Sequence, residues 1–204
     1  MVMAGILIEE SKLHELKKMG VKDSKLLAHS KRKELFKKIV LMAKEYSIII
    51  IEPWEVDEAL NSKKLNLNWL EAHKSAQIIN GLKPERVVID SPSNNVVKYK
   101  AYLMDLLDNK KIKAVVEHKA DVNHVECSAA SILAKVTRED EVEKLKKKYG
   151  DFGSGYLTDP LTIKFMKENF EKHPEIFRKT WAPYKELVNG KNQKNLSDFG
   201  EVEK

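Results

Sequence analysis

The segment from Cys127 to Val136 constrains the fold most, because it combines small and apolar side chains within one helical stretch. Its small members are Ser128, Ala129, Ala130, Ser131 and Ala134. Small side chains let a helix come close to a neighbouring element or to a ligand. The helical pattern extends from Glu126 to Tyr149, so we expect one long helix packed against the core or lining a site.

Strand-like and helix-like segments alternate along the chain. Apolar or β-branched runs predict strands at residues 1–8, 47–51, 86–90 and 112–116. Helical spacing and capping residues predict helices at 12–18, 30–46, 53–60, 67–80, 96–107, 126–149, 160–170 and 182–188. Gly81 is expected to end one of them, and residues 189–204 form a polar tail that we expect to fray. Such alternation is typical of an α/β fold.

Charge and cysteine content narrow the functional classes. The 204 residues include 37 Lys and Arg against 31 Asp and Glu, which gives a formal charge of +6 and suits a polyanionic partner without requiring one. The single cysteine, Cys127, excludes an intramolecular disulfide and is typical of the reducing cytoplasm. No apolar run approaches the roughly 18–20 residues of a membrane span, so we expect no membrane partner.

Two carboxylates stand where strands and helices meet. Asp90 ends the apolar run that begins at Arg86, and Asp121 immediately precedes the long helix. The two could converge on one spot, and hard divalent cations such as Mg²⁺ prefer oxygen ligands of this kind. The residues alone leave an alternative open, in which Asp90 forms a turn and Asp121 starts a helix.

Three ordered motifs resemble those of ribonuclease HII, in particular the archaeal type. They are H-K-A-D at 118–121, S-A-A-S-I-L-A-K-V-T-R-E at 128–139 and G-S-G-Y with D-P at 153–160. The resemblance implies an RNase H-like core, in which a mixed sheet is flanked by helices. We therefore expect a core at residues 1–150, a helical portion at 151–190 that helps to clamp the duplex, and a flexible tail at 191–204.

The resemblance also implies an activity. Members of this family hydrolyse the RNA strand of RNA–DNA hybrids and incise on the 5′ side of single ribonucleotides embedded in duplex DNA. Two metal ions, Mg²⁺ or Mn²⁺, can activate the water and stabilise the leaving oxygen. By motif match, Asp90 and Asp121 are the metal-binding and catalytic residues. The implied partners are the hybrid and the ribonucleotide-containing duplex, and we expect a cytoplasmic monomer.

Further residues match family positions that contact substrate. The family tyrosine, Tyr156 here, stacks on the sugar at the RNA–DNA junction, where a 2′-OH distinguishes the two nucleic acids. The remaining implied contacts are Gly153, Ser154, Gly155, Lys22, Ser24, Lys25, Ser128 and Lys135. Alternatives remain open: Tyr156 as a loop aromatic packed on the core, Lys135 as a solvated lysine, and residues 22–25 as an ordinary turn.

The sequence departs from the family pattern at its start. The family opens with a strand that leads into D-E-A-G-R-G, which supplies two further acidic residues and a phosphate-gripping turn, and this chain begins inside that pattern. In the family the strand lies between those matching residues 2–8 and 86–90. Our hypothesis is that Met1 is an internal methionine. The alternatives are a catalytically silent hybrid binder and an unfolded or swapped fragment; the related ribonuclease HIII type fits the motifs less well.

Overall fold

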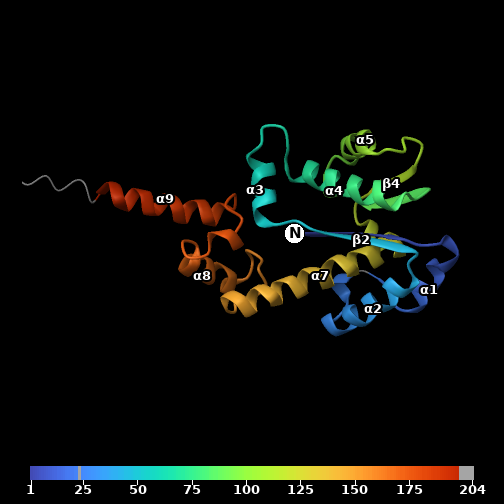
Figure 1. Ribbon diagram of the computed structural model, residues 1–204, viewed down its shortest axis with the longest axis horizontal. Helices are drawn as coiled ribbons and strands as arrows, with labels where there is room; N and C mark the ends of the chain where they lie inside the picture. The colour runs from blue at the N-terminus through green and yellow to red at the C-terminus, as the bar shows by residue number, and fades with distance from the viewer. Residues whose placement is uncertain (23, 198–204) are drawn as a thin grey trace, which may run out of the picture. The chain divides into compact units, whose positions relative to one another are not determined.

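The computed structural model describes residues 1–22 and 24–197, and the side chains of residues up to 190 (Figure 1). The chain divides into two compact units. The first comprises Met1–Ile51 and Asn66–Glu141, and the second comprises Glu52–Leu65 and Val142–Lys204. The division into core, clamping portion and tail made from the sequence stays a prediction.

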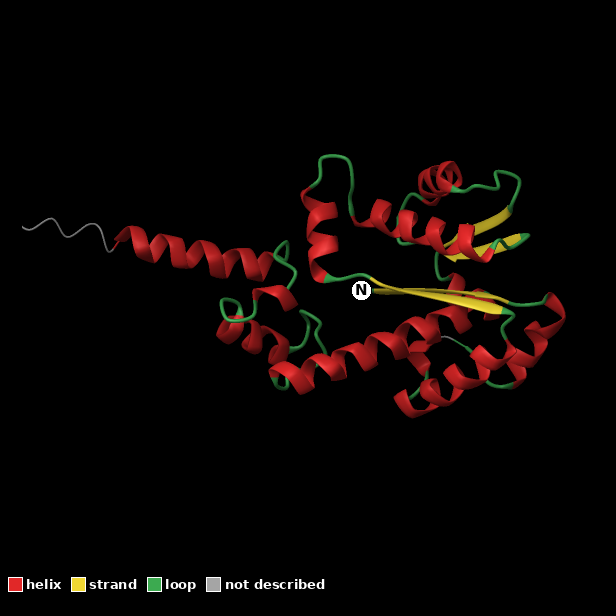
Figure 2. Ribbon diagram, in the orientation of Figure 1, coloured by secondary structure: helices red, strands yellow, loops and turns green. Residues whose placement is uncertain are grey.

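The first unit contains all four strands of the described residues (Figure 2). In chain order its elements are β1 (Val2–Leu7), a 3₁₀ turn (Glu10–Lys12), α1 (Leu13–Lys18), a second 3₁₀ turn (Ser24–Leu26), α2 (His29–Met42), β2 (Glu45–Ile50), α4 (Leu67–Leu82), β3 (Arg86–Asp90), α5 (Val96–Leu106), β4 (Lys113–Glu117), α6 (Ala120–Asn123) and the part of α7 (Val125–Tyr149) up to Glu141. Helices and strands alternate, which confirms the predicted α/β class.

The strands form one antiparallel and one parallel pair. β1 pairs with β2, with Val2 opposite Ile50, and β3 pairs with β4, with Asp90 opposite Glu117. Within residues 1–22 and 24–197, β1 and β3 do not pair with each other.

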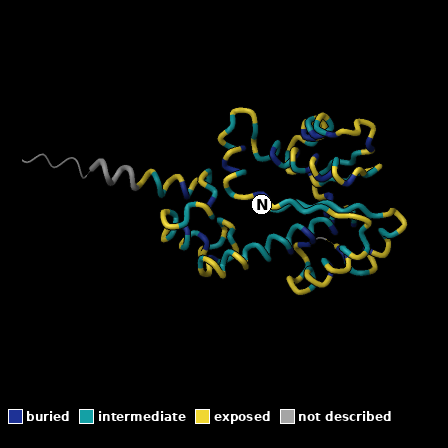
Figure 3. The backbone as a smooth tube through the Cα atoms, in the orientation of Figure 1, coloured by how far each residue is buried: buried dark blue, intermediate teal, exposed yellow. Residues whose placement is uncertain are grey.

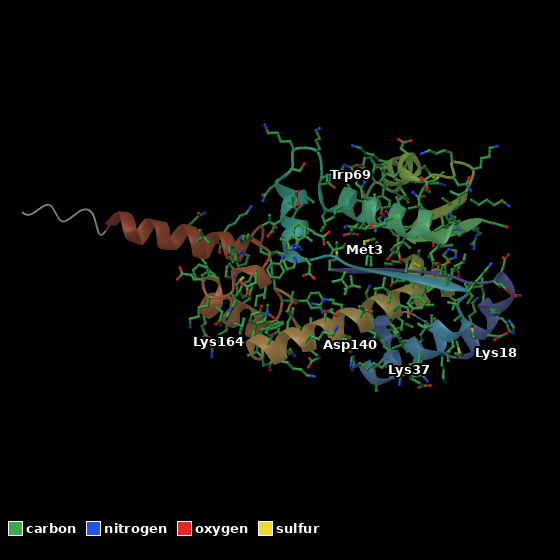
Figure 4. All side chains as sticks on the ribbon, viewed as in Figure 1. Met3, Lys18, Lys37, Trp69, Asp140 and Lys164 are labelled. Atoms are coloured by element: carbon green, nitrogen blue, oxygen red, sulfur yellow. The ribbon has the colours of Figure 1, made fainter. Side chains whose placement is uncertain are left out.

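Helices cover both faces of the β1–β2 pair. Ala4 and Ile6 of β1 pack into a cluster whose buried members come mainly from α1, α2 and α7: Leu16, Val21, Leu35, Ile39, Val125, Ala129, Ile132, Leu133 and Val136. The intervening Gly5 faces α4, since side chains alternate across a strand. Every residue of β1 is half-buried (Figure 3). Exposed lysines, among them Lys18 and Lys37, project from α1 and α2 (Figure 4).

A second cluster joins α4 and α5 to the parallel pair. Its buried members include Ala72 of α4 and both Tyr99 and Leu103 of α5. Val87 of β3 and Val116 of β4 are partly buried and pack against this cluster. Tyr99 is only 1% exposed. The small residues of α4 allow the two helices to approach closely, and this packing supports the strands that carry the candidate site.

The second unit contains α3 (Pro53–Asn61), the end of α7, α8 (Pro160–Asn169), a 3₁₀ turn (Pro174–Ile176) and α9 (Ala182–Ser197). Met166, Phe177 and Tyr184 form its buried cluster. Asp57 of α3 is buried and accepts hydrogen bonds from the amides of Lys179 and Thr180 at 2.7 and 3.0 Å. A buried carboxylate is stabilised by such donors, so this residue fixes the loop before α9.

Several predicted boundaries are wrong. α2 begins at His29 and ends at Met42, and β2 begins at Glu45, because residues 45 and 46 pair with β1. Gly81 lies inside α4, and the left-handed backbone of Lys83 (φ 49°) ends that helix. α9 continues to Ser197 beyond the predicted end at residue 188, since most residues after Gly190 tolerate a helix. Residues 198–204 of the predicted tail lie outside the described residues.

The predicted start of α8 is confirmed. Asp159 caps α8 through the amide of Leu161 at 2.9 Å, and Pro160 occupies the first helical position. Among the described residues, no helix combines the length and the apolar character needed to cross a bilayer.

We predict that Gly5→Ala lowers the free energy of unfolding by about 1–3 kcal/mol, because an added methyl overpacks the contact between β1 and α4. A Cβ at Gly5 would lie 2.5 Å from Cγ2 of Ile78. The matched control is Gly81→Ala within α4, where a Cβ would meet nothing within 4 Å. Alanine should raise stability there by about 0.5–1 kcal/mol. Urea unfolding followed by circular dichroism measures both, and equal stability of the two variants would contradict the close approach.

Candidate metal centre and nucleic-acid site

The parallel pairing of β3 and β4 creates the edge on which the candidate site lies. Both strands end at the same edge, with Asp90 opposite Glu117. The amide of Ser91 donates to the carbonyl oxygen of Glu117 at 2.8 Å and extends the pairing by one bond. Oδ1 of Asp90 accepts a hydrogen bond from the amide of Ala120 at 3.2 Å. The carboxylate of Asp90 therefore lies at the start of α6.

The short helix α6 carries the second carboxylate. It begins after Lys119, whose backbone is left-handed (φ 59°), and it contains Asp121, which is 6% exposed. Ser128 is buried in α7, and its hydroxyl donates to the carbonyl oxygens of Asp121 at 2.5 Å and His124 at 3.2 Å. Because Ala120 bonds to Asp90 and directly precedes Asp121, the structure brings the two predicted metal ligands together.

The pKa values of two groups in the first unit, Cys127 and Glu71, are raised in part by negative charge at the candidate site. Burial, followed by the negative charges of Asp90 and Asp121, raises the pKa of the Cys127 thiol to about 12. Burial and then the charge of Asp90 raise the pKa of the Glu71 carboxyl. A cation at this point would be attracted by the same charges that disfavour the ionised thiol and carboxyl.

The donor set fits a metal ion that is shared with a substrate. Mg²⁺ commonly binds proteins through one or two carboxylates, with water and phosphate oxygens as its other ligands. The carboxylate of Asp90 lies at the amide that precedes Asp121, and the charges of both residues act on Cys127. Among the described residues, no group of three or more His, Cys, Asp or Glu side chains is arranged to hold a metal ion alone. The chain therefore offers part of a coordination sphere.

Sequence reasoning missed two acidic neighbours of this site, Glu71 and Glu117. Glu71 lies on the same face of α4 as the buried residues Ser75 and Ile78, and its place on this inner face was the available signal. Glu117 adjoins the H-K-A-D motif, but its position beside Asp90 follows only from the strand register. A register of this kind cannot be read from one sequence.

The predicted contacts in the first unit fall into two groups. Lys22 and Lys25 are exposed, and Lys135 is half-buried. Ser24 is fully buried with its hydroxyl 3.0 Å from that of Ser131, and Ser128 is buried against the carbonyls described above. Their hydroxyls thus hold the 3₁₀ turn and α6 to α7. The assignment of these residues to substrate binding stays a prediction.

The glycine-tyrosine loop belongs to the second unit. Gly153 and Gly155 both have φ 73°, a backbone conformation that favours glycine. The carboxylate of Asp159 accepts a hydrogen bond from the amide of Ser154 at 2.7 Å. This bond is the largest cause of the lowered pKa of Asp159. A Cβ at Gly153 would lie 2.4 Å from that carboxylate. The loop is therefore tightly closed, and it presents Tyr156 with 52% of its surface exposed.

Comparison with known proteins identifies the family. The family model described as Ribonuclease HII matches residues 1–184. The chain belongs to the ribonuclease HII family. Ribonuclease HII of Pyrococcus furiosus is 40% identical over 208 residues, covering 98% of this chain and 91% of its own length. That of Saccharolobus solfataricus is 39% identical, with 89% and 83% covered. These relatives support the archaeal type.

Solved structures agree with this ribonuclease HII assignment. The ribonuclease H2 of Pyrococcus horikoshii superposes with a TM-score of 0.81 at 34% identity, covering 93% of this chain and 98% of that chain. A ribonuclease HII from Archaeoglobus fulgidus, solved in complex with PCNA, gives a TM-score of 0.81 at 36% identity, with 91% and 88% covered. The RNase H-like core is thereby confirmed.

Family membership establishes the coarse activity. The chain is a ribonuclease H-type endoribonuclease for the RNA strand of RNA–DNA hybrids, and its family is metal-dependent. The alternative of a catalytically silent binder is not favoured. Ribonuclease HIII of Bst shares the fold at 21% identity, so the likeness to the HIII type is one of fold alone.

We predict that alkylation of Cys127 by iodoacetamide stays slow until well above pH 9, because its thiol has a pKa of about 12 and only the thiolate reacts. Asp90→Asn removes one of the charges that disfavour the thiolate, so its pKa should fall and the reaction should accelerate at fixed pH. The control is Asp105→Asn on the exposed side of α5. Identical pH profiles for Asp90→Asn and the unaltered chain would contradict the proximity of Asp90 to Cys127.

Proposed function

We propose that this ribonuclease HII incises duplex DNA on the 5′ side of single embedded ribonucleotides, in addition to cutting the RNA strand of hybrids. The hydrogen bond from Ala120 to Asp90 carries the proposal, because it brings Asp90 and Asp121 to one acidic point at the end of the parallel strands. A phosphodiester placed there would lie next to both motif carboxylates.

Asp90 and Asp121 would hold the metal, Mg²⁺ or Mn²⁺, together with phosphate oxygens of the substrate. Two bound ions supply an activated water and stabilise the leaving oxygen. The protein's part is to fix the carboxylates. Asp90 is oriented by the Ala120 amide, and Asp121 is held through its carbonyl by the buried Ser128 hydroxyl. The Asp90 carboxylate and the backbone of Asp121 are thus held in place before a metal binds.

Recognition of the substrate would depend on the sugars and the phosphate backbone of the nucleic acid. Tyr156, half-exposed on its closed loop of Gly153, Ser154 and Gly155, would stack on the sugar at the junction where a 2′-OH marks the ribonucleotide. Lys22, Lys25 and Lys135 would contact the phosphates. Such contacts are electrostatic, so affinity should fall steeply with salt. Ser24 and Ser128, whose hydroxyls are buried, would act by holding the 3₁₀ turn and α6 to α7.

A protein partner is suggested by one relative. The Archaeoglobus fulgidus ribonuclease HII was solved in complex with PCNA. We therefore propose that a PCNA-type clamp also binds this chain. The monomeric state and the cytoplasmic location expected from the sequence stay predictions.

We predict that the chain cuts a DNA duplex carrying one ribonucleotide in the presence of Mn²⁺ or Mg²⁺, leaving 3′-hydroxyl and 5′-phosphate ends. Asp121→Asn should slow cutting by more than about 100-fold, exceeding the usual effect of residues that only support metal ligands. Asp105→Asn, which alters an exposed carboxylate on α5, should cut at the unaltered rate.

The same assay discriminates the alternatives. Hybrid binding without metal-dependent cutting by the unaltered chain would favour a silent binder. Unchanged cutting by Asp121→Asn would remove that residue from the proposed centre. An all-DNA duplex serves as the negative substrate, because it lacks the 2′-OH.

A further inference from the structure

The side chain of Glu117 contacts the helix that carries Asp121. Glu117 ends β4 and lies opposite Asp90 in the parallel register. Its Oε1 accepts a hydrogen bond from Nδ2 of Asn123 at 2.8 Å and lies 3.2 Å from Nε2 of His124. Asn123 is the last residue of α6, and His124 follows it. One carboxylate oxygen therefore holds the far end of α6.

α6 requires holding because it is short. It has four residues, and a single helical turn is unstable alone because nucleation fixes several dihedrals for one hydrogen bond. It also follows Lys119, whose left-handed backbone (φ 59°) is strained for a residue other than glycine. The contacts around α6 must offset these costs for Asp121 to keep one position.

The contacts come from both strands of the parallel pair. At the first residue of α6, the Ala120 amide bonds to Asp90 at the end of β3. In the middle, the Ser128 hydroxyl bonds to the Asp121 carbonyl. At the far end, Asn123 and His124 bond to Glu117 at the end of β4. The Glu117 contacts act through the side chains of Asn123 and His124.

We propose that Glu117 is a positioning residue of the metal centre. Through Asn123 and His124 it fixes the orientation of α6 and so the separation of Asp121 from Asp90. The inference rests on the proposed role of those two aspartates as metal ligands. Glu117 acts by accepting hydrogen bonds, and an amide oxygen at the same place would serve.

A second carboxylate near His124 provides a matched control. Oε1 of Glu126 lies 3.9 Å from Nδ1 of His124 and also accepts a hydrogen bond from Nη1 of Arg86 at 3.1 Å. Glu126→Gln therefore removes a negative charge from the same neighbourhood while leaving the contact of α6 with β4 in place. Glu117→Gln keeps an acceptor oxygen but loses the charge, and Glu117→Ala loses both.

The test is a Mn²⁺ titration of the full chain, with free Mn²⁺ measured by electron paramagnetic resonance below the unfolding temperature of each variant. Glu117→Ala should weaken binding by about 10- to 100-fold, the usual effect of a residue that orients a metal ligand. Glu117→Gln and Glu126→Gln should both bind within about 3-fold of the unaltered chain, since each keeps the hydrogen bonds that orient α6. A purely structural role would lower the unfolding temperature and leave the affinity of the folded chain unchanged.

The outcomes separate this proposal from the proposed function. If Asp121→Asn weakens Mn²⁺ binding and Glu117→Ala does not, the positioning role is wrong and the metal centre stands. If Glu117→Gln binds Mn²⁺ as weakly as Glu117→Ala does, the charge of Glu117 and not its hydrogen bonding determines the affinity, and the proposal is again overturned. If the unaltered chain binds no Mn²⁺, or Asp121→Asn binds it as well as the unaltered chain does, the metal centre itself fails and the positioning role fails with it.

Discussion

The parallel pairing of β3 with β4 is the constraint on which the candidate site depends. Parallel strands end at one edge, and here that edge carries Asp90 and Glu117 side by side. The chain leaves β4 and forms α6 at once, so its first amide meets Asp90 and its last side chains meet Glu117. A shift of the register by one residue would separate these contacts, because it would turn the end residues to opposite faces.

Packing behind the strands keeps that register. α4 and α5 enclose Tyr99 and Leu103 against the parallel pair, and α7 brings Ser128 under α6. The small residues of the segment from Cys127 to Val136 allow α7 to come this close to α6. Burial, followed by the charges of Asp90 and Asp121, raises the pKa of Cys127, and burial followed by the charge of Asp90 raises the pKa of Glu71.

The sequence predicted what depends on local pattern and on motif. The strand Arg86–Asp90 has the predicted bounds, and the cap at Asp159 is where the D-P pair indicated it. The pattern could not reveal where β2 begins. Glu45 and Tyr46 continue the helical pattern of the preceding segment, but their pairing with β1 makes them part of the strand. It also missed Glu117, whose role follows from the register and from the one-turn helix α6.

In the function proposed above, Asp90 and Asp121 share a single cation site. Paramagnetic broadening of backbone amide signals by substoichiometric Mn²⁺ would reveal such a site, because the effect falls steeply with distance from the ion. We expect the strongest broadening at residues 90–91 and 120–121 together, and its loss from both segments in Asp121→Asn. Broadening that is confined to one of the two segments, or that persists unchanged in the variant, would contradict the shared site.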